Sequence, residues 1–87
     1  MHIPDTSRDS TLEIHTNASA KALSGVLYQR VGSVLHPCAF HSRRLSPAEE
    51  NYSATDRELL AIVDTLRNFR HYVHGTNFVV RTDHAPL

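Results

Sequence analysis

The chain has 87 residues, and nine acidic and nine basic side chains leave it without formal net charge when the histidines are neutral. This length allows one small domain, and the balanced charge excludes a global field that would draw the chain to nucleic acid or membrane. No apolar run approaches the length of a membrane span, and no signal-peptide pattern opens the sequence. Because Cys38 is the only cysteine, no intramolecular disulfide can form, and an intracellular, reducing location is expected.

A polar lead-in over residues 1–10, expected to be flexible, precedes the predicted domain at residues 11–87. Residues 11–17 alternate between apolar and polar side chains, which predicts a strand. The two faces of this strand carry Leu12, Ile14 and Thr16 on one side and Glu13, His15 and Asn17 on the other.

Two further strands are predicted to form an antiparallel hairpin. Residues 22–30 form the first, and Gly25 inside it indicates either a bulge or a close backbone approach. Residues 31–33 form a short reversal, so residues 34–42 should pair back on the preceding strand. Pro37 removes a donor from this third strand, which is therefore expected at an edge of the sheet.

A short helical turn and one long helix are predicted next. Ser46, Pro47 and Glu49 have the pattern of a capping box with proline at the first helical position. Residues 53–73 repeat apolar side chains at three- and four-residue steps, which predicts one helix with one buried stripe and Ser53 as its N-cap. The expected stripe consists of Leu59, Ile62, Val63, Leu66, Phe69 and Val73.

Glu58 does not fit a purely apolar stripe. It lies four residues before Ile62, on or beside the side of the helix that should face the sheet. Two interpretations are open: a boundary glutamate that reaches solvent, or a carboxylate directed at a site between the helix and the sheet.

The run at residues 78–82 is rich in β-branched and aromatic residues and predicts a fourth strand. A crossover through the long helix would make this strand parallel to a neighbour. If that neighbour is the first strand, Asn17 and Asp83 lie together at the carboxyl ends of two parallel strands. Open α/β sheets place their sites at such ends, and Glu58 could reach this one.

Three blocks carry a resemblance to a known family: HTNASAKALSGVLYQ, HPCAFHSRRLSPAEENYSATDRELLAIV and FVVRTDHAPL. They resemble the RNase H domain of gypsy-class LTR retrotransposon reverse transcriptases, or of host genes derived from them. The resemblance implies an α/β, RNase H-like fold with a three-stranded antiparallel meander, a long helix and a fourth strand parallel to the first, in the order 3-2-1-4. The family's fifth strand and C-terminal helices are missing from this sequence, so a truncated domain is expected.

The resemblance also implies a two-metal nuclease that hydrolyses the RNA strand of an RNA–DNA hybrid with Mg²⁺, or alternatively Mn²⁺. Its metal ligands would be Glu58, Asp83 and, in place of the family's first aspartate, Asn17. An amide oxygen brings no charge and cannot bridge two cations, and the family's fourth acid falls beyond residue 87. A weak or inactive nuclease is therefore expected. Asn17 is either an engineered substitution or native to a decayed or domesticated copy.

A second function from another class is open, namely a non-catalytic interaction or scaffold module. Its expected contact is the apolar strand at residues 78–82, whose edge would pair with another copy and form a homo-oligomer. Arg43, Arg44 and His84 are weaker candidates for contacts with nucleic acid, and each is equally explained as a surface residue. Cys38 is expected to be a buried, inert thiol.

Overall fold

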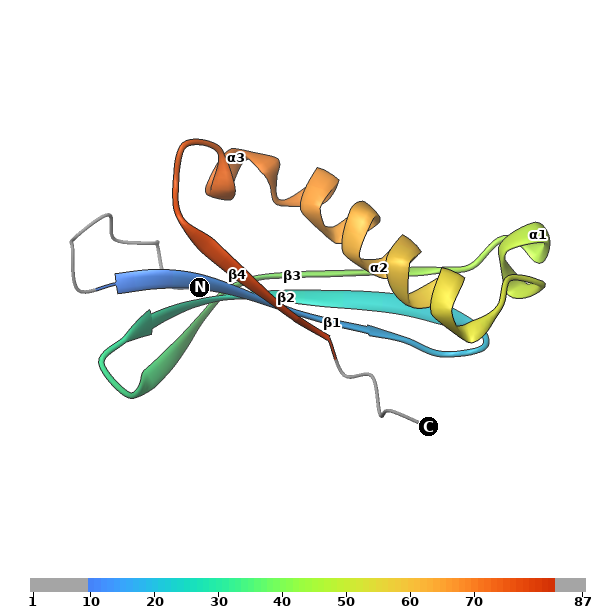
Figure 1. Ribbon diagram of the computed structural model, residues 1–87, viewed down its shortest axis with the longest axis horizontal. Helices are drawn as coiled ribbons and strands as arrows, with labels where there is room; N and C mark the ends of the chain where they lie inside the picture. The colour runs from blue at the N-terminus through green and yellow to red at the C-terminus, as the bar shows by residue number, and fades with distance from the viewer. Residues whose placement is uncertain (1–9, 83–87) are drawn as a thin grey trace.

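A computed structural model describes residues 10–82, which form a four-stranded sheet with the helices on one of its faces (Figure 1). The strands are β1 (Ser10–Ala18), β2 (Ala22–Val31), β3 (Val34–Arg44) and β4 (Phe78–Thr82). The helices are α1 (Pro47–Glu50), α2 (Ala54–Asn68) and α3 (Arg70–Val73). All four strands were predicted, with bounds that differ by at most two residues at either end of each strand.

The strand order is β3-β2-β1-β4, with β1 and β2 antiparallel, β2 and β3 antiparallel, and β1 and β4 parallel. This confirms the predicted α/β architecture and places β3 at an edge, where Pro37 is tolerated. Gly32 turns the β2–β3 hairpin with a φ of 63°, in the left-handed region that favours glycine.

The bulge lies in β3 rather than at Gly25. Leu27 pairs with Ala39 and Tyr28 pairs with Pro37, so Cys38 is the extra residue on the bulged strand. Gly25 instead marks a close approach, which was the other predicted possibility. A Cβ atom added there would lie 2.2 Å from Thr65 Cγ2, so α2 can pack this closely only on a glycine.

The prediction of a single helix over residues 53–73 was wrong. Phe69, with φ −98° and ψ 13°, separates α2 from α3, and its side chain is only 2% exposed. The predicted N-cap is confirmed, because Ser53 Oγ accepts from the Asp56 N–H at 3.1 Å. Gly75 follows α3 with a φ of 72°, in the left-handed region that favours glycine.

The predicted buried stripe was also partly wrong. Leu59 is 55% exposed and Val63 is 47% exposed, whereas Ala61 and Thr65 are the buried residues of α2. Small side chains face the sheet because α2 lies so close to Gly25 that larger ones would not fit. Glu58 is half-buried and lies three residues before Ala61, on the same side of the helix.

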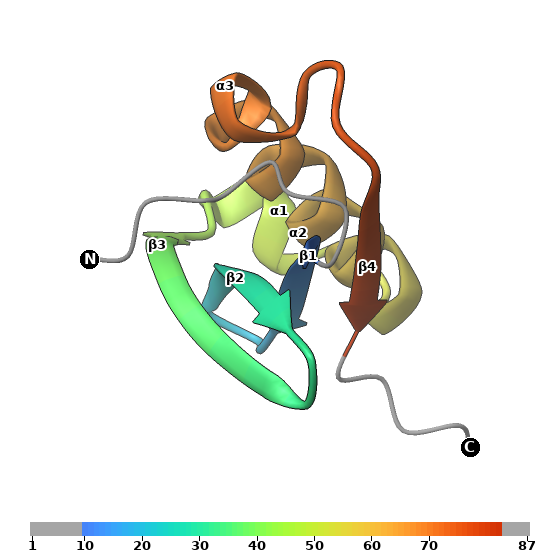
Figure 2. The same ribbon diagram turned by 90° about the vertical axis from the view of Figure 1, so that its left-hand side faces the viewer.

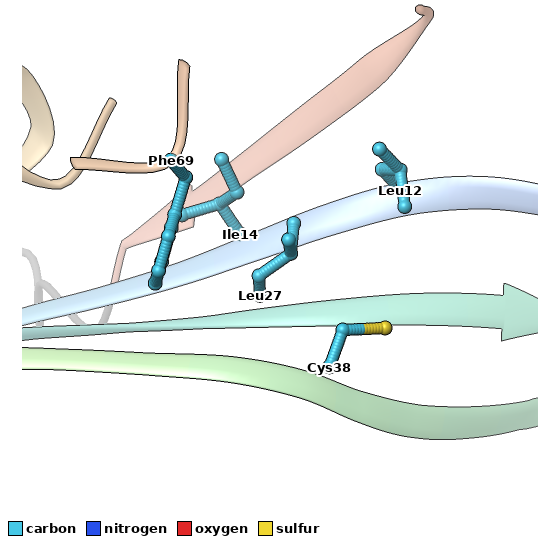
Figure 3. Close-up of a cluster of buried hydrophobic side chains, with 5 residues drawn as sticks. All are labelled: Leu12, Ile14, Leu27, Cys38 and Phe69. Atoms are coloured by element: carbon cyan, nitrogen blue, oxygen red, sulfur yellow. The ribbon is translucent and has the colours of Figure 1, made fainter. Parts of the chain in front are cut away.

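Two clusters form the core between the helices and the sheet. In the larger one, side chains from β1, β2 and β3 meet Phe69 (Figure 3). The smaller one lies nearer α1 and contains Leu23, Leu45 and Ala61. Cys38 belongs to the larger cluster, and burial raises the pKa of its thiol, so it is buried as predicted. The members of the larger cluster are Leu12, Ile14, Leu27, Cys38 and Phe69.

Candidate functional site

The parallel pairing of β1 and β4 positions the predicted site. Thr16 lies opposite Thr82, and Asn17 follows Thr16 directly at the carboxyl end of β1. The predicted ligand Asp83 and the neighbouring His84 fall outside the described residues. Their contribution to the site therefore stays a prediction.

The structure brings Asn17 and Glu58 together. Both line a small cavity between the end of β1 and the N-terminal half of α2. Its volume is about 10 Å³, close to the least that holds one water molecule. Glu58 therefore lies beside the strand ends, and its role as a metal ligand stays a prediction. The complete lining is Thr16, Asn17, Ala18, Glu58, Ala61 and Thr82.

The described donor set suits a hard cation only in part. Carboxylate and amide oxygens are ligands that Mg²⁺ accepts, but Glu58 brings the one negative charge among the cavity's lining residues. Across residues 10–82, no three histidine, cysteine, aspartate or glutamate side chains lie close enough to hold a metal together. The described residues therefore do not form a two-ion site.

The two arginines proposed as nucleic-acid contacts differ in their surroundings. Arg43 donates to Glu49 through both terminal nitrogens, at 2.8 and 3.0 Å, and its Nε lies 3.2 Å from Asp64 Oδ2. His41 Nε2 lies 2.7 Å from the same Asp64 oxygen. Arg43 thus links β3 to α1 and α2, and its charge is balanced within the fold. Arg44 is exposed.

A charged cluster on the opposite face of the sheet was missed from the sequence. The Glu13 side chain is 3% exposed, although alternation placed it on the polar face. Its carboxylate pairs with Arg30, accepts from Arg81 Nε at 2.9 Å and lies 3.0 Å from His15 Nε2. The hydrogen bond from Arg30, with smaller contributions from His15 and Arg81, lowers the pKa of Glu13 to about 2. The sequence signal that could have revealed this cluster is the acidic Glu13 on β1 together with the basic Arg30 on β2 and Arg81 on β4.

None of the described helices is long and apolar enough to cross a membrane.

The chain matches a family model described as the RNase H-like domain found in reverse transcriptase, over residues 7–87. It is 44% identical over 87 residues to the retrovirus-related Pol polyprotein from transposon 297 of Drosophila melanogaster, covering 100% of this chain and 8% of that polyprotein. It is 38% identical over 77 residues to the transposon Tf2-3 polyprotein of Schizosaccharomyces pombe, covering 85% of this chain and 6% of that polyprotein. The chain therefore spans only a small part of these relatives.

Among solved structures, the fold is similar to that of a foamy viral protease-reverse transcriptase in complex with dsDNA, with a TM-score of 0.69. The match covers 93% of this chain and 17% of the viral chain, at 18% identity. This similarity shows the fold alone.

Proposed function

The chain belongs to the family of RNase H-like domains found in reverse transcriptases, and from that membership we propose that it engages RNA–DNA hybrids but hydrolyses them weakly. The observation that carries the proposal is the cavity shared by Asn17 and Glu58 beside the paired ends of β1 and β4. A carboxylate there suits hydrolysis with a divalent cation, whereas the amide of Asn17 removes a charge that such a site needs.

Asn17 is the residue that limits the site in this proposal. Its amide oxygen can coordinate one cation, but it carries no negative charge to offset that of the cation and cannot bridge two cations as the carboxylate of an aspartate does. Mg²⁺ or Mn²⁺ should therefore bind weakly, with Glu58 as the charged ligand from the described chain. When bound, the cation would supply charge stabilisation to phosphodiester hydrolysis.

Replacing Asn17 with aspartate is expected to raise the rate of hybrid cleavage at least tenfold, because each missing interaction of this kind costs more than about 1.4 kcal/mol in the transition state. The measurement is single-turnover cleavage of a labelled RNA–DNA hybrid in Mg²⁺ and in Mn²⁺. Adding Glu58→Gln to Asn17→Asp should abolish the gain.

The matched control is Asn77→Asp, which makes the same chemical change at an exposed position just before β4, at the other end of that strand. It should leave cleavage unchanged. Metal binding is followed separately through the broadening of amide NMR signals near residues 17 and 58 on addition of Mn²⁺. A cleavage rate that stays the same in Asn17→Asp, with tighter Mn²⁺ binding, would contradict the proposal that Asn17 limits hydrolysis.

A second candidate function is self-association through β4, favoured by its exposed apolar residues. Phe78 is 38% exposed and Val79 is 43% exposed, on a strand that pairs only with β1 among the described strands. An apolar strand edge is a template for pairing with another chain.

If β4 mediates this contact, Val79→Lys should weaken self-association about tenfold in sedimentation equilibrium, because a charged edge strand opposes pairing. Val34→Lys is the matched control, since Val34 is 52% exposed at the start of β3, away from this edge. A protein that sediments as a monomer at high micromolar concentration would contradict this candidate.

A further inference from the structure

Asp64 joins α2 to the edge strand β3 through a network of charged side chains. Its Oδ2 atom lies 2.7 Å from His41 Nε2 and 3.2 Å from Arg43 Nε, so one carboxylate oxygen contacts two side chains of β3. Arg43 in turn donates to Glu49 of α1 through both terminal nitrogens. These four residues, which we call the β3 network, are His41, Arg43, Glu49 and Asp64.

The β3 network contacts one side of α2, and Glu58 lies on another. The helix lies over the sheet between β3 and β4, the first and last strands in the strand order (Figure 2). Each residue of a helix turns it by about 100°, so Glu58 and Asp64, six residues apart, are separated by roughly 120° around the axis. Asp64 contacts β3, whereas Glu58 lies at the cavity beside the ends of β1 and β4. A rotation of α2 that separates Asp64 from β3 therefore also displaces Glu58.

Burial of apolar side chains by itself would favour a different rotation of α2. Leu59 and Val63 are exposed, although both are larger and more apolar than Ala61 and Thr65, which face the sheet. A rotation that turned Leu59 and Val63 towards the sheet would remove their apolar surface from water and so be favourable. Other contacts must hold the observed rotation against this tendency.

The packing of Thr65 on Gly25 limits how closely α2 approaches the sheet but gives it no polar anchor. A Cβ atom at Gly25 would meet the Thr65 side chain, and Thr65 Oγ1 has no hydrogen-bond partner in the described chain. The β3 network differs because hydrogen bonds weaken steeply when they are misaligned. Its contacts with Asp64 are directional, and they resist rotation of the helix.

We propose that Asp64 is a positioning residue: held by His41 and Arg43, it fixes the rotation of α2 and thereby keeps Glu58 beside the ends of β1 and β4. None of these three network residues lines the cavity that Glu58 shares with Asn17. The effect on cleavage rests on the proposed function, because it requires that Glu58 takes part in hydrolysis. The rotation of α2 does not require it and is measured separately.

The test variant is Asp64→Ala, which removes both contacts with β3. The NMR relaxation of the Leu59 and Val63 methyl groups by a soluble paramagnetic agent should fall, because α2 turns them away from solvent. The nuclear Overhauser effect between Glu58 and the Ala18 methyl group, which line the same small cavity, should be lost. Asp64→Asn should show the same changes to a smaller extent, since its amide oxygen still accepts hydrogen bonds.

Cleavage is measured in the Asn17→Asp background under single-turnover conditions. Adding Asp64→Ala should lower the rate by up to about 100-fold, because a displacement of about 1 Å at a reacting group can cost this much. If the NMR changes appear while cleavage stays the same, Asp64 positions α2 but Glu58 does not take part in hydrolysis. That outcome contradicts the proposed function and leaves the positioning of α2 supported.

Glu13→Gln is the matched control, because it also lowers stability but its ion pairs with Arg30 and Arg81 lie on the other face of the sheet. It should leave the NMR relaxation of Leu59 and Val63, the Glu58–Ala18 effect and the cleavage rate unchanged. The proposal is overturned if Asp64→Ala and Asp64→Asn leave both NMR measurements unchanged. It is overturned equally if Glu13→Gln changes them as much, since a general loss of stability would then be the cause.

Discussion

Replacing Gly25 with alanine is expected to destabilise the protein by about 3 kcal/mol, at the upper end of the costs of overpacking. The added Cβ would meet three side-chain atoms of Thr65, at 2.2, 2.4 and 2.9 Å. Contacts this short force α2 away from β2, and α2 carries the buried Ala61 of the smaller core cluster. A small domain has a free energy of unfolding of only about 5–15 kcal/mol, so this loss is a large part of the total.

Urea unfolding of four proteins checks this expectation: the unchanged chain, Gly25→Ala, Thr65→Ala and the double variant. Thr65→Ala removes the two nearest atoms, so Gly25→Ala should cost clearly less in that background. Thr65→Ala also removes a buried hydroxyl oxygen that has no hydrogen-bond partner in the described chain. Equal costs of Gly25→Ala in the two backgrounds would show that the contact with Thr65 is not the cause.

Replacing Glu13 with glutamine is expected to destabilise the protein by about 2 kcal/mol at neutral pH. The buried carboxylate holds Arg30 and Arg81, and the amide that replaces it brings no charge to either pair. The loss stays below that of a fully buried ion pair, because the side chains of Arg30 and Arg81 are 37% and 61% exposed and can be hydrated.

The same substitution should change how stability depends on pH. The pKa of Glu13 is lowered from 4.5 to about 2 in the folded chain. A carboxyl group with a lowered folded pKa contributes stability above pH 4.5, and this contribution is lost as the pH falls through 4.5 towards 2. The difference in free energy of unfolding between the unchanged chain and Glu13→Gln should therefore be largest at neutral pH and nearly vanish by pH 2.

Urea unfolding across this pH range measures the effect. The pKa of Glu49 is also lowered to about 2, chiefly by Arg43, but Glu49 is present in both proteins and cancels from their difference. Glu50→Gln is the control, since Glu50 has a longer contact of 3.6 Å to the exposed Lys21 and should change stability little. If the difference in free energy of unfolding between the unchanged chain and Glu13→Gln stays constant with pH, the ion pairs of Glu13 are not its cause.

Much of the fold could be predicted because its signals are local. Alternation in residues 11–17, the reversal at residues 31–33 and the caps at Ser46 and Ser53 each depend on a few neighbouring residues. The position of β3 at an edge followed from Pro37, and the crossover through the long helix predicted that β4 runs parallel to a neighbouring strand. The resemblance to the RNase H family identified that neighbour as β1.

The candidate site was predictable only in outline. Parallel pairing of the first and fourth strands was expected to bring their carboxyl ends together, and the observed pairing of Thr16 with Thr82 agrees with this expectation. The direction of Glu58 could not be decided from periodicity, because the apolar stripe was centred on the wrong side of the helix. Leu59 and Val63 are exposed, and the buried side runs through Ala61 and Thr65.

Local sequence patterns determined where the strands lie along the chain and where each predicted helix starts, because hydrophobic periodicity and capping act over one or two turns. The spatial order of the strands was predicted from the resemblance to the RNase H family. Only the tertiary structure decided the rotation of α2, the break at Phe69 and the burial of Glu13. The physical reason is that these depend on contacts between distant segments. Gly25 leaves space for the side chain of Thr65 on α2, and Glu13 accepts a hydrogen bond from Arg81 on β4. Local sequence patterns cannot predict contacts between residues so far apart in the chain.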